Sequence, residues 1–353
     1  MKPSMLLLLS LALAAMPTVA NDKLQVSGFG SIVAGQVLDG SGYVADYPNL
    51  GRYDDQLDLS QETRMGIQAN ATLSDKLRAT MQVMTRANNE YEPQVEWLFV
   101  NYAITDDLDL QAGKLRLPVY YFSEYMDVGI AYPWVRVPSD AYSLDIASFD
   151  GLQLNHRTFV GDTSFTTTVY AGRAESGATS ELMTYLFGEN IEREFTGIKG
   201  VGFEVNRDST IFKMSYTVAD LDETRPTVAS ENDGEITFLD VYFQQNFGPM
   251  SVMLEYNDYD PFYQSYFVSG TYTLGKNTFY LMNSKFTLDA EIGGTPIEEH
   301  DTNSIGVRHN LSTTTALKFD ISMINDTGFF AVNQDSANDG DATIFTTSLD
   351  FMF

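Results

Sequence analysis

The segment from Thr343 to Phe353 (TIFTTSLDFMF), at the carboxyl end of the sequence, alternates between two faces. Successive side chains of a strand point to opposite sides, so one face is rich in aromatics while the other includes Asp350. The aromatic face carries Thr343, Phe345, Thr347, Leu349, Phe351 and Phe353. Such a strand suits the wall of a transmembrane β-barrel, whose outer side is apolar with aromatic residues at the water boundary. A soluble protein gains little from an exposed terminal Phe353, so we expect a transmembrane barrel closed by this strand.

The other end of the sequence has the features of a secretory signal. Lys2 precedes an apolar stretch from Leu6 to Ala15, and Pro17 and small residues follow up to Ala20. A single membrane-spanning helix is the alternative, but the apolar stretch is shorter than the roughly 20 residues that a span requires. We predict cleavage after Ala20, so that residues 1–20 are a signal peptide and residues 21–353 form a single barrel domain.

The composition excludes several classes of function. The chain contains no cysteine, which excludes disulfides, thiolate nucleophiles and cysteine-ligated metals. Its formal net charge of −27 repels the phosphates of DNA and RNA, so a nucleic acid is not an expected partner. The sequence therefore favours a secreted protein that acts in or near a membrane rather than a nucleic-acid-binding protein.

Alternation of apolar and polar residues recurs along the chain and predicts successive strands. The clearest alternating segments are residues 64–73, 77–86, 212–218, 250–257 and 317–323. Short turn signals occur near Ser74-Asp75, Thr105-Asp107, Gly161-Asp162, Arg207-Asp208, Gly248-Pro249, Leu274-Lys276 and Ser312-Thr313. Longer polar connections, such as residues 220–234 and 289–301, lie between these turns. Tight turns on one rim and long loops on the other are typical of an outer-membrane barrel.

The number of turns predicts the number of strands. Seven short turns separate eight hairpins, which make sixteen strands. At about 10–12 residues each, sixteen strands use roughly half of residues 21–353 and leave the rest for connections. We therefore predict an all-β fold, a transmembrane antiparallel β-barrel of about sixteen strands, closed because an open edge in lipid leaves backbone groups unpaired. A pair of soluble β-sandwiches is the alternative, and it explains neither the terminal Phe353 nor the regular turns.

Along nearly its whole length after residue 20, the chain resembles the sixteen-stranded porin family of Gram-negative bacteria. The matching segments are Leu24 to Gly35, Ser60 to Val83, and the ending SLDFMF, which resembles the terminal strand of outer-membrane proteins. The segment Leu110 to Gly129 resembles the region where porins leave a strand and enter their third loop. The second loop is shorter than in general porins, which argues against the usual loop-latched subunit contact.

The resemblance implies both a location and an activity. It places the chain in the outer membrane of a Gram-negative bacterium, in contact with lipid and lipopolysaccharide. It further implies a homotrimer of barrels, a third loop folded inward to narrow each pore, and passive diffusion of small hydrophilic solutes. No cofactor is expected.

The largest connection, residues 118–147, is the candidate third loop. It carries Tyr120, Tyr121, Phe122, Tyr125, Tyr132 and Trp134. A loop packed against the inner wall of the barrel can bury such rings, whereas a solvated external loop has little use for them. We therefore place this loop in the lumen, with Glu124 and Asp127 as its acidic pore-constriction residues. The alternative is an external lid whose aromatic residues pack against one another or against a neighbouring subunit.

Arginines on the polar faces of early strands are the matching basic candidates. We expect Arg64, Arg78 and Arg86 to line the pore constriction, with Arg116 and Arg157 as companions. Arg64 and Arg78 lie on adjacent strands and are predicted to form a ladder on the wall. Arginines opposite acids across a narrow lumen produce a transverse field that biases the choice of ion. The alternative is that each arginine pairs with a nearby carboxylate on the barrel wall.

The remaining acidic residues are predicted to lie mostly in external loops. These residues are Asp220, Asp222, Glu223, Glu231, Asp233, Glu298, Glu299, Asp301, Asp335, Asp339 and Asp341. Acidic loops can bind divalent cations through oxygen ligands and bridge them to lipopolysaccharide phosphates. No loop has the ligand spacing of an EF-hand, so a solvated acidic rim is favoured and no specific metal site is assigned.

An enzyme is the main competing class of function. Serine hydrolysis needs a base near the nucleophile, and the chain offers His156 and His309 on strands and His300 in a predicted acidic loop. No catalytic motif such as GxSxG or HExxH is present, so no catalytic residue is assigned. A plugged active transporter would need a globular segment before the first strand, which begins by Leu24.

Two kinds of channel remain open, together with an adhesive role. The first is a general diffusion pore of weak selectivity. The second is a channel biased toward small organic anions or phosphate, since the predicted arginine wall opposes the overall negative charge. An adhesin role is compatible with either channel, because external loops are exposed in both.

Overall fold

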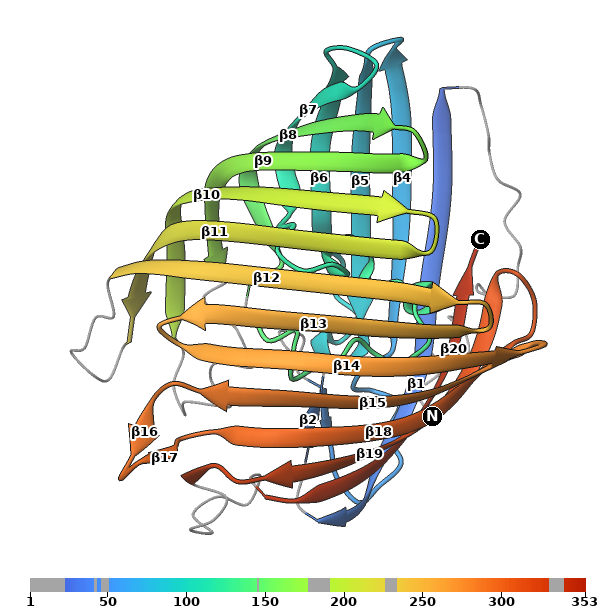
Figure 1. Ribbon diagram of the computed structural model, residues 1–353, viewed down its shortest axis with the longest axis vertical. Coiled ribbons are helices and arrows are strands. Elements are labelled where there is room, and N and C mark those ends of the chain that lie inside the picture. Colours follow the sequence, from blue (N-terminus) through green and yellow to red (C-terminus); the bar gives the residue numbers. More distant parts are fainter. Residues whose placement is uncertain are drawn as a thin grey trace.

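The computed structural model describes residues 23–40, 43–45, 51–144, 146–176, 191–225, 234–329 and 340–353. The predicted signal peptide lies outside these residues. Within them, sixteen strands close into one antiparallel barrel, which confirms the predicted fold class and strand number (Figure 1). In the same ranges, no helix combines the length and the apolar character needed to span a membrane.

The barrel strands follow one another around the wall, and the last closes on the first. Their bounds are β1 (Leu24–Gly40), β4 (Arg64–Ser74), β5 (Leu77–Arg86), β6 (Gln94–Ala103), β7 (Leu108–Arg116), β8 (Ser148–Val160), β9 (Thr163–Ser176), β10 (Glu192–Arg207), β11 (Thr210–Thr224), β12 (Gly234–Phe247), β13 (Met250–Asp260), β14 (Tyr263–Leu274), β15 (Asn277–Leu288), β18 (Glu299–Asn310), β19 (Thr315–Asp326) and β20 (Ala342–Met352). Shorter elements are β2 (Tyr43–Ala45), β3 (Gly51–Tyr53), β16 (Glu291–Ile292), β17 (Thr295–Pro296), and the 3-10 turns η1 (Ala87–Asn89), η2 (Ser123–Tyr125) and η3 (Gly129–Ala131).

The connections on one rim are as short as predicted. Each of the seven predicted turns joins two consecutive strands of the described chain. Gly248 and Gly275 have φ angles of +61° and +62°, a backbone conformation that side chains disfavour and that tight hairpins require. On the opposite rim, the second loop between β5 and β6 is short, as expected. The β13–β14 connection, Pro261-Phe262, is unexpectedly tight for that rim.

The closing pair joins β1 to β20 in the predicted orientation. Gly28 and Phe353 exchange two backbone hydrogen bonds of 2.8 and 2.9 Å. Asp350 points into the barrel and is fully buried, and its carboxylate accepts a hydrogen bond from the Ser31 hydroxyl at 2.6 Å. The terminal segment therefore presents its polar face to the lumen and its aromatic face outward.

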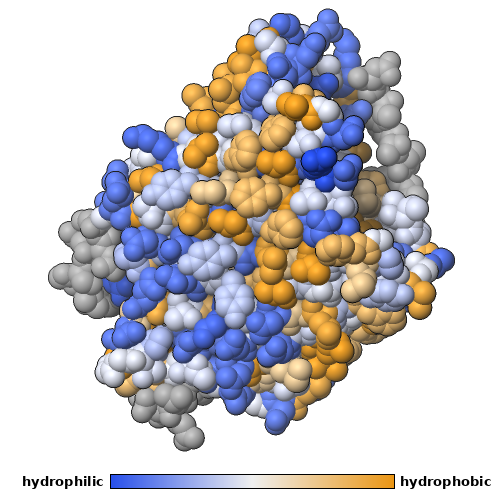
Figure 2. Space-filling model, in the orientation of Figure 1, coloured by the Kyte–Doolittle hydropathy of each residue, from blue (hydrophilic) through white to orange (hydrophobic). Residues whose placement is uncertain are grey.

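A band of apolar side chains runs across the outer wall. Leu154, Val169, Val201 and Tyr216 are cross-strand neighbours on β8 to β11, and each is at least 36% exposed. Figure 2 shows apolar side chains spread over this side of the molecule. Lipid is the medium in which such a surface is stable, so the outer face is the membrane-contacting face.

Several acidic residues expected in external loops lie in strands instead. Asp220, Asp222 and Glu223 belong to β11, and Glu299 and Asp301 belong to β18. These strands continue beyond the alternating segments recognised in the sequence because polar residues also pair in a sheet above the lipid. Four further acids, Glu231, Asp233, Asp335 and Asp339, lie outside the described residues.

A charge on the outer face tests which side of the wall meets lipid. We expect Val169→Arg to lower the free energy of unfolding by about 2–4 kcal/mol, the cost of an arginine near the bilayer midplane. Thr168→Arg, one residue away on the lumen side, is the matched control and should cost far less. Urea unfolding in phospholipid vesicles measures both, and equal losses would contradict the assignment of faces.

Candidate functional site

The connection between β7 and β8, residues 117–147, lies inside the barrel, and we call it the lumen loop. Its rings pack against the inner wall: Tyr121 stacks on Tyr242 of β12 at 3.7 Å between centroids. Trp134 is buried and donates a hydrogen bond from its indole nitrogen to the Ser269 hydroxyl of β14 at 2.9 Å. The prediction of an inward-folded third loop is therefore confirmed, and the alternative of an external lid is excluded.

A buried lysine anchors the middle of the lumen loop. Lys318 of β19 is fully buried, and its ammonium donates to the backbone carbonyls of Gly129 and Trp134, at 2.5 Å each. The same ammonium lies 2.9 Å from the Asp350 carboxylate. A Cβ on Gly129 would lie 2.2 Å from an oxygen of Asp350, so only glycine allows the loop to come this close to the wall.

A second anchor attaches the loop to β13, four strands from β19 around the wall. Glu255 of β13 is almost completely buried. Its carboxylate accepts hydrogen bonds from the Tyr121 backbone amide at 2.8 Å and from the Tyr142 hydroxyl at 2.5 Å. The lumen loop is thus held by β13 as well as by β19, and it crosses the lumen between them.

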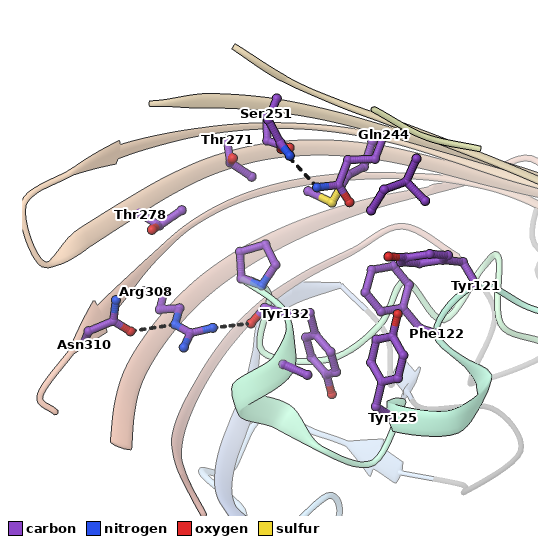
Figure 3. A pocket seen from close by; sticks show the side chains of 15 residues that line it. Tyr121, Phe122, Tyr125, Tyr132, Gln244, Ser251, Thr271, Thr278, Arg308 and Asn310 are labelled. Carbon is purple, nitrogen blue, oxygen red and sulfur yellow. Dashed lines mark hydrogen bonds between the residues drawn. The ribbon is translucent and has the colours of Figure 1, made fainter. Parts of the chain in front are cut away.

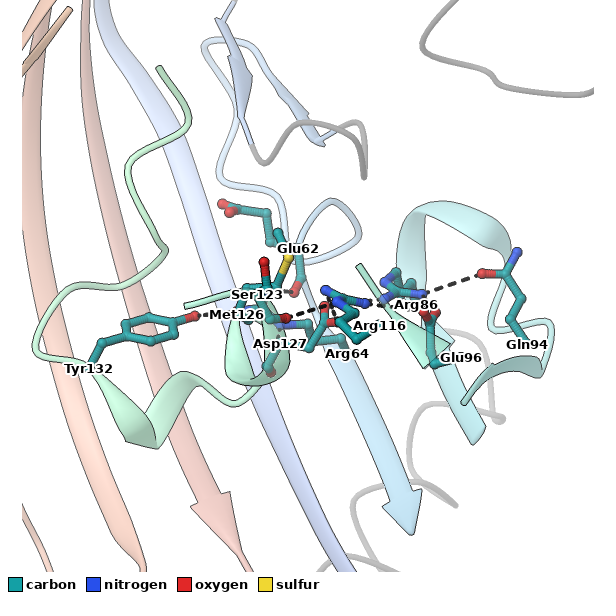
Figure 4. Close-up of polar contacts among 10 residues, drawn as sticks. All are labelled: Glu62, Arg64, Arg86, Gln94, Glu96, Arg116, Ser123, Met126, Asp127 and Tyr132. Carbon is teal, nitrogen blue, oxygen red and sulfur yellow. Dashed lines mark hydrogen bonds and ion pairs between the residues drawn. The ribbon is translucent and has the colours of Figure 1, made fainter. Parts of the chain in front are cut away.

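The third anchor is an arginine cluster, which we define as Arg64, Arg86, Arg116, Glu96 and Asp127 (Figure 4). Asp127, on the lumen loop, accepts from Arg86 at 3.2 Å and from Arg116 at 3.1 Å. Glu96 of β6 bridges the same two guanidiniums from the wall, at 2.5 and 3.4 Å. Arg64 donates to the Asp127 backbone carbonyl at 3.1 Å. Four of the seven predicted constriction residues therefore meet at one point.

The charges of the arginine cluster do not cancel. As defined, the cluster contains three guanidiniums and two carboxylates, a formal charge of +1 within a strongly acidic chain. The adjoining Glu62 carboxylate, which also interacts with Arg64, is paired with Arg136, so including both leaves this sum unchanged. Burial alone would raise the pKa of the Asp127 carboxyl. The positive charges of Arg86, Arg116 and Arg64 outweigh that effect and hold the pKa of Asp127 well below its usual range.

The other predicted constriction residues lie elsewhere. Register pairs Arg64 with Arg86, whereas Arg78 is opposite Thr72 near the short turn, so the predicted Arg64–Arg78 ladder is wrong. Both residues have side chains on the lumen side, but antiparallel pairing separates them along the wall. Arg78 and Arg157 are exposed toward the short-turn rim, and Glu124 is exposed on the lumen loop. None of these three side chains joins the arginine cluster as the described contacts define it.

Sequence reasoning missed a further ion pair that holds the lumen loop. Arg136 donates two hydrogen bonds of 2.6 Å to the buried carboxylate of Glu62, just before β4. Glu62 also accepts from the Tyr53 hydroxyl at 2.7 Å, which ties the loop to β3 in the first long connection. The available signal was a lone arginine within the aromatic loop sequence, and charge at such a position implies a buried partner.

The three histidines do not form a catalytic arrangement. His300 lies at the start of β18 rather than in an acidic loop, and it is stacked on Phe286. Its Nδ1 is 3.2 Å from Asp140 of the lumen loop, so it acts as a further loop contact.

His156 on β8 is 3.6 Å from Asp107, and His309 lies 2.7 Å from the Asn277 side chain. Among the described residues, no group of three or more acidic, histidine or cysteine side chains could hold a metal ion.

Two cavities lie in the lumen on different sides of the barrel. The first, of about 410 Å³, lies between the lumen loop and strands β11 to β18. The second, of about 680 Å³, is lined by β1 and β4 to β7 and includes Arg78, Lys76 and Asp109. Residues near the short turns contribute to both cavities, so both are in the half of the lumen next to that rim.

Comparisons with known proteins agree with this architecture. A profile of the family described as Gram-negative porin matches residues 8–350. Among solved structures, the chain is similar to the outer membrane channel DcaP of Acinetobacter baumannii, with a TM-score of 0.66 and 12% identity over 95% of this chain and 99% of that one.

Two further solved structures have the same fold. The anion-selective porin from Comamonas acidovorans has a TM-score of 0.60 and 12% identity over 94% of this chain and 99% of that one. OmpT of Vibrio cholerae, in its trimer form, has a TM-score of 0.58 and 13% identity over 94% and 100%. No curated protein matches the chain.

The depressed pKa of Asp127 predicts how the loop responds to acid. A carboxyl with a lowered pKa stabilises the fold above its unfolded-state value of about 3.9, and that stability is lost only as pH falls through the lower folded value. In a Glu124→Gln background, which removes the exposed acid of the lumen loop, single-channel conductance should therefore stay constant from pH 7 down to about 4. Asp127→Asn should instead give noisier, larger openings already at pH 7, since it leaves three guanidiniums with one carboxylate. In the Glu124→Gln background, a conductance change with its midpoint near the ordinary aspartate value would contradict the hold of the arginines on Asp127.

Proposed function

The chain belongs to the Gram-negative porin family and forms an outer-membrane channel for passive diffusion, and we propose that the lumen loop and the arginine cluster set its constriction. Small hydrophilic solutes and ions then pass the loop through the space left between it and the wall. The observation that carries this proposal is the set of anchors from opposite walls, Lys318, Glu255 and the arginine cluster, which hold one loop across the lumen.

The arginine cluster acts through its field rather than by touching solutes. Arg64, Arg86 and Arg116 are each at most 6% exposed, because the lumen loop covers them. In a narrow channel with low-dielectric walls, a buried net charge still biases the local concentration of ions. The exposed acidic rim is screened within about 8 Å at physiological ionic strength and so has less influence at the constriction. Glu124, exposed on the loop, is the acid that we expect passing ions to meet there.

A channel biased toward small organic anions or phosphate is the second candidate. It is favoured by the excess of one positive charge in the arginine cluster and by Arg78 in the larger cavity. The structural relative from Comamonas acidovorans is an anion-selective porin, so the same fold can carry this preference. A solute that blocks conductance at low concentration would favour this candidate over a general pore.

We infer that the chain is a channel rather than an enzyme. The histidine nearest to a described carboxylate, His300, holds the lumen loop and stacks on Phe286, which leaves it no nucleophile to activate.

Lipid and lipopolysaccharide surround the outer wall in this proposal. Divalent cations at the acidic strand ends are the predicted bridge to lipopolysaccharide phosphates.

Removing charge from the arginine cluster tests the selectivity mechanism. Arg64→Gln removes one guanidinium without removing a partner carboxylate, so anion preference should fall and the reversal potential under a salt gradient should move toward the cation value. Arg78→Gln is the matched control because Arg78 is exposed at the rim, and it should shift the potential less. A larger shift in the control would locate the selective step in the larger cavity instead.

We also propose that three barrels associate, since a structural relative is described in a trimer form. Single insertions into a planar bilayer should then close in three equal steps. Chemical cross-linking in mild detergent should give a species of three times the mass of the cleaved chain, residues 21–353, and heating should abolish it. Openings in single steps, together with a monomer on cross-linking, would contradict the trimer.

A further inference from the structure

The smaller lumen cavity has two chemically different sides (Figure 3). The lumen loop supplies Tyr121, Phe122, Tyr125 and Tyr132, while the strands supply mainly amide and hydroxyl side chains. Its volume of about 410 Å³ lies within the range of small-molecule pockets. None of the five residues of the arginine cluster lines it, so this cavity lies beside the lumen loop but apart from the arginine cluster.

The cavity is close to neutral in a chain that is otherwise acidic. Of the described residues that line it, none is acidic, and Arg308 is the one with a formal charge. That guanidinium is already engaged, since it donates to the backbone carbonyls of Ile130 and Tyr132 at 2.8 and 3.0 Å. The lining therefore suits a neutral solute better than a cation or a strongly charged anion.

Contacts within the protein orient two amides so that their donors remain available. The Tyr242 hydroxyl donates to Gln244 at 2.7 Å, and the Gln244 amide donates to the side-chain oxygen of Asn246 at 3.0 Å. Across the cavity, Arg308 Nε donates to the side-chain oxygen of Asn310 at 2.9 Å. The side-chain oxygens of Asn246 and Asn310 therefore both accept a hydrogen bond. Neither NH₂ group donates to a partner within the described part of the chain.

Hydroxyl groups add to these donors. Thr271 and Thr278 line the wall beside the amides, and Ser251 Oγ is buried without a hydrogen-bond partner among the described residues. Such groups can both donate and accept, so they match a solute that carries several hydroxyls of its own. A buried hydroxyl without a partner is costly, and a bound solute can offset that cost.

The aromatic side supplies a complementary surface. Tyr121 and Tyr125 are half-buried in the lumen loop, and their rings meet edge to face with centroids 6.1 Å apart. Tyr242 covers one face of the Tyr121 ring, so Tyr125 is the ring of this pair that can offer a face to a solute. Such a face is electron-rich and attracts the weakly positive C–H groups of a saturated ring. A saturated chair-form ring with C–H groups on its face and hydroxyls at its edge matches both sides of the cavity at once.

We propose that this cavity binds a neutral pyranose sugar during its passage, with C–H groups against Tyr125 and hydroxyls on Asn246 and Asn310. The inference rests on the proposed channel function and adds to it a class of preferred solute. It concerns binding in the lumen between the loop and the wall and involves no chemical step.

The test uses the full protein in a planar bilayer with glucose as the probe. Glucose should interrupt the ion current in a concentration-dependent, saturable way. Sorbitol, an acyclic polyol of the same carbon number, has no ring and so no C–H face for the aromatic contact. If that contact is worth about 1.4 kcal/mol, sorbitol should bind about tenfold more weakly than glucose.

Two variants probe the two sides independently. Tyr125→Leu removes a ring from the loop side, and Asn246→Ala removes an amide donor from the wall, so a folding defect in one does not compromise the other. Each should weaken interruption by glucose roughly fivefold to tenfold. Thr80→Ala, in the larger cavity, is the matched control and should leave it unchanged.

The outcomes separate this inference from the channel proposal. A protein that conducts but responds equally to glucose and sorbitol would overturn the sugar site and leave the channel intact. Equal losses in Thr80→Ala and Asn246→Ala would overturn it too, by showing that the effect is not local. A folded protein that never conducts would overturn the channel proposal and this inference together.

Discussion

Every part of this structure depends on the need to pair backbone groups inside lipid. No water is present there to bond an open strand edge, so the sheet must close, and the pairing of β1 with β20 closes it. Closure gives the wall two faces of different chemistry at alternate residues. The outer face carries Val169 and its apolar neighbours, and the inner face carries charged and polar groups. Those inner groups can then hold a loop, and the loop in turn shapes the passage.

The lumen loop is stabilised by unusual means for a loop. Its rings bury apolar area against one another and the wall, but charged side chains determine where it lies. Lys318, Glu255 and the arginine cluster approach it from different strands, and each satisfies backbone or carboxylate groups that burial would otherwise leave unpaired. Because a buried pair is costly to break from one side, the loop has few alternative positions. A passage bounded by such a loop keeps a constant shape.

Features with a local signature could be predicted from the sequence, and features that depend on register could not. Turn residues indicated the strand number, and alternation indicated the orientation of the last strand. The aromatic residues of segment 118–147 indicated the loop in the lumen. The sequence placed the arginines on the inner face, but the side chains that each arginine meets depend on the register between adjacent strands. Arg64 therefore meets Arg86 rather than Arg78. The pairs Arg136–Glu62 and Lys318–Asp350 join segments far apart in the chain, and neither has a local pattern that would reveal it.

The closing pair also determines the order in which the molecule can be built. Ser31 and Asp350, which meet across it, are 319 positions apart in the chain. Bringing such distant segments together carries the largest loop-closure entropy of any contact in the wall, so it is expected to form last. Until then β1 and β20 each expose an unpaired edge, which is a template for aggregation. An unclosed chain is therefore open to pairing with the edge of another copy, and the joining of β1 to β20 removes both edges at once.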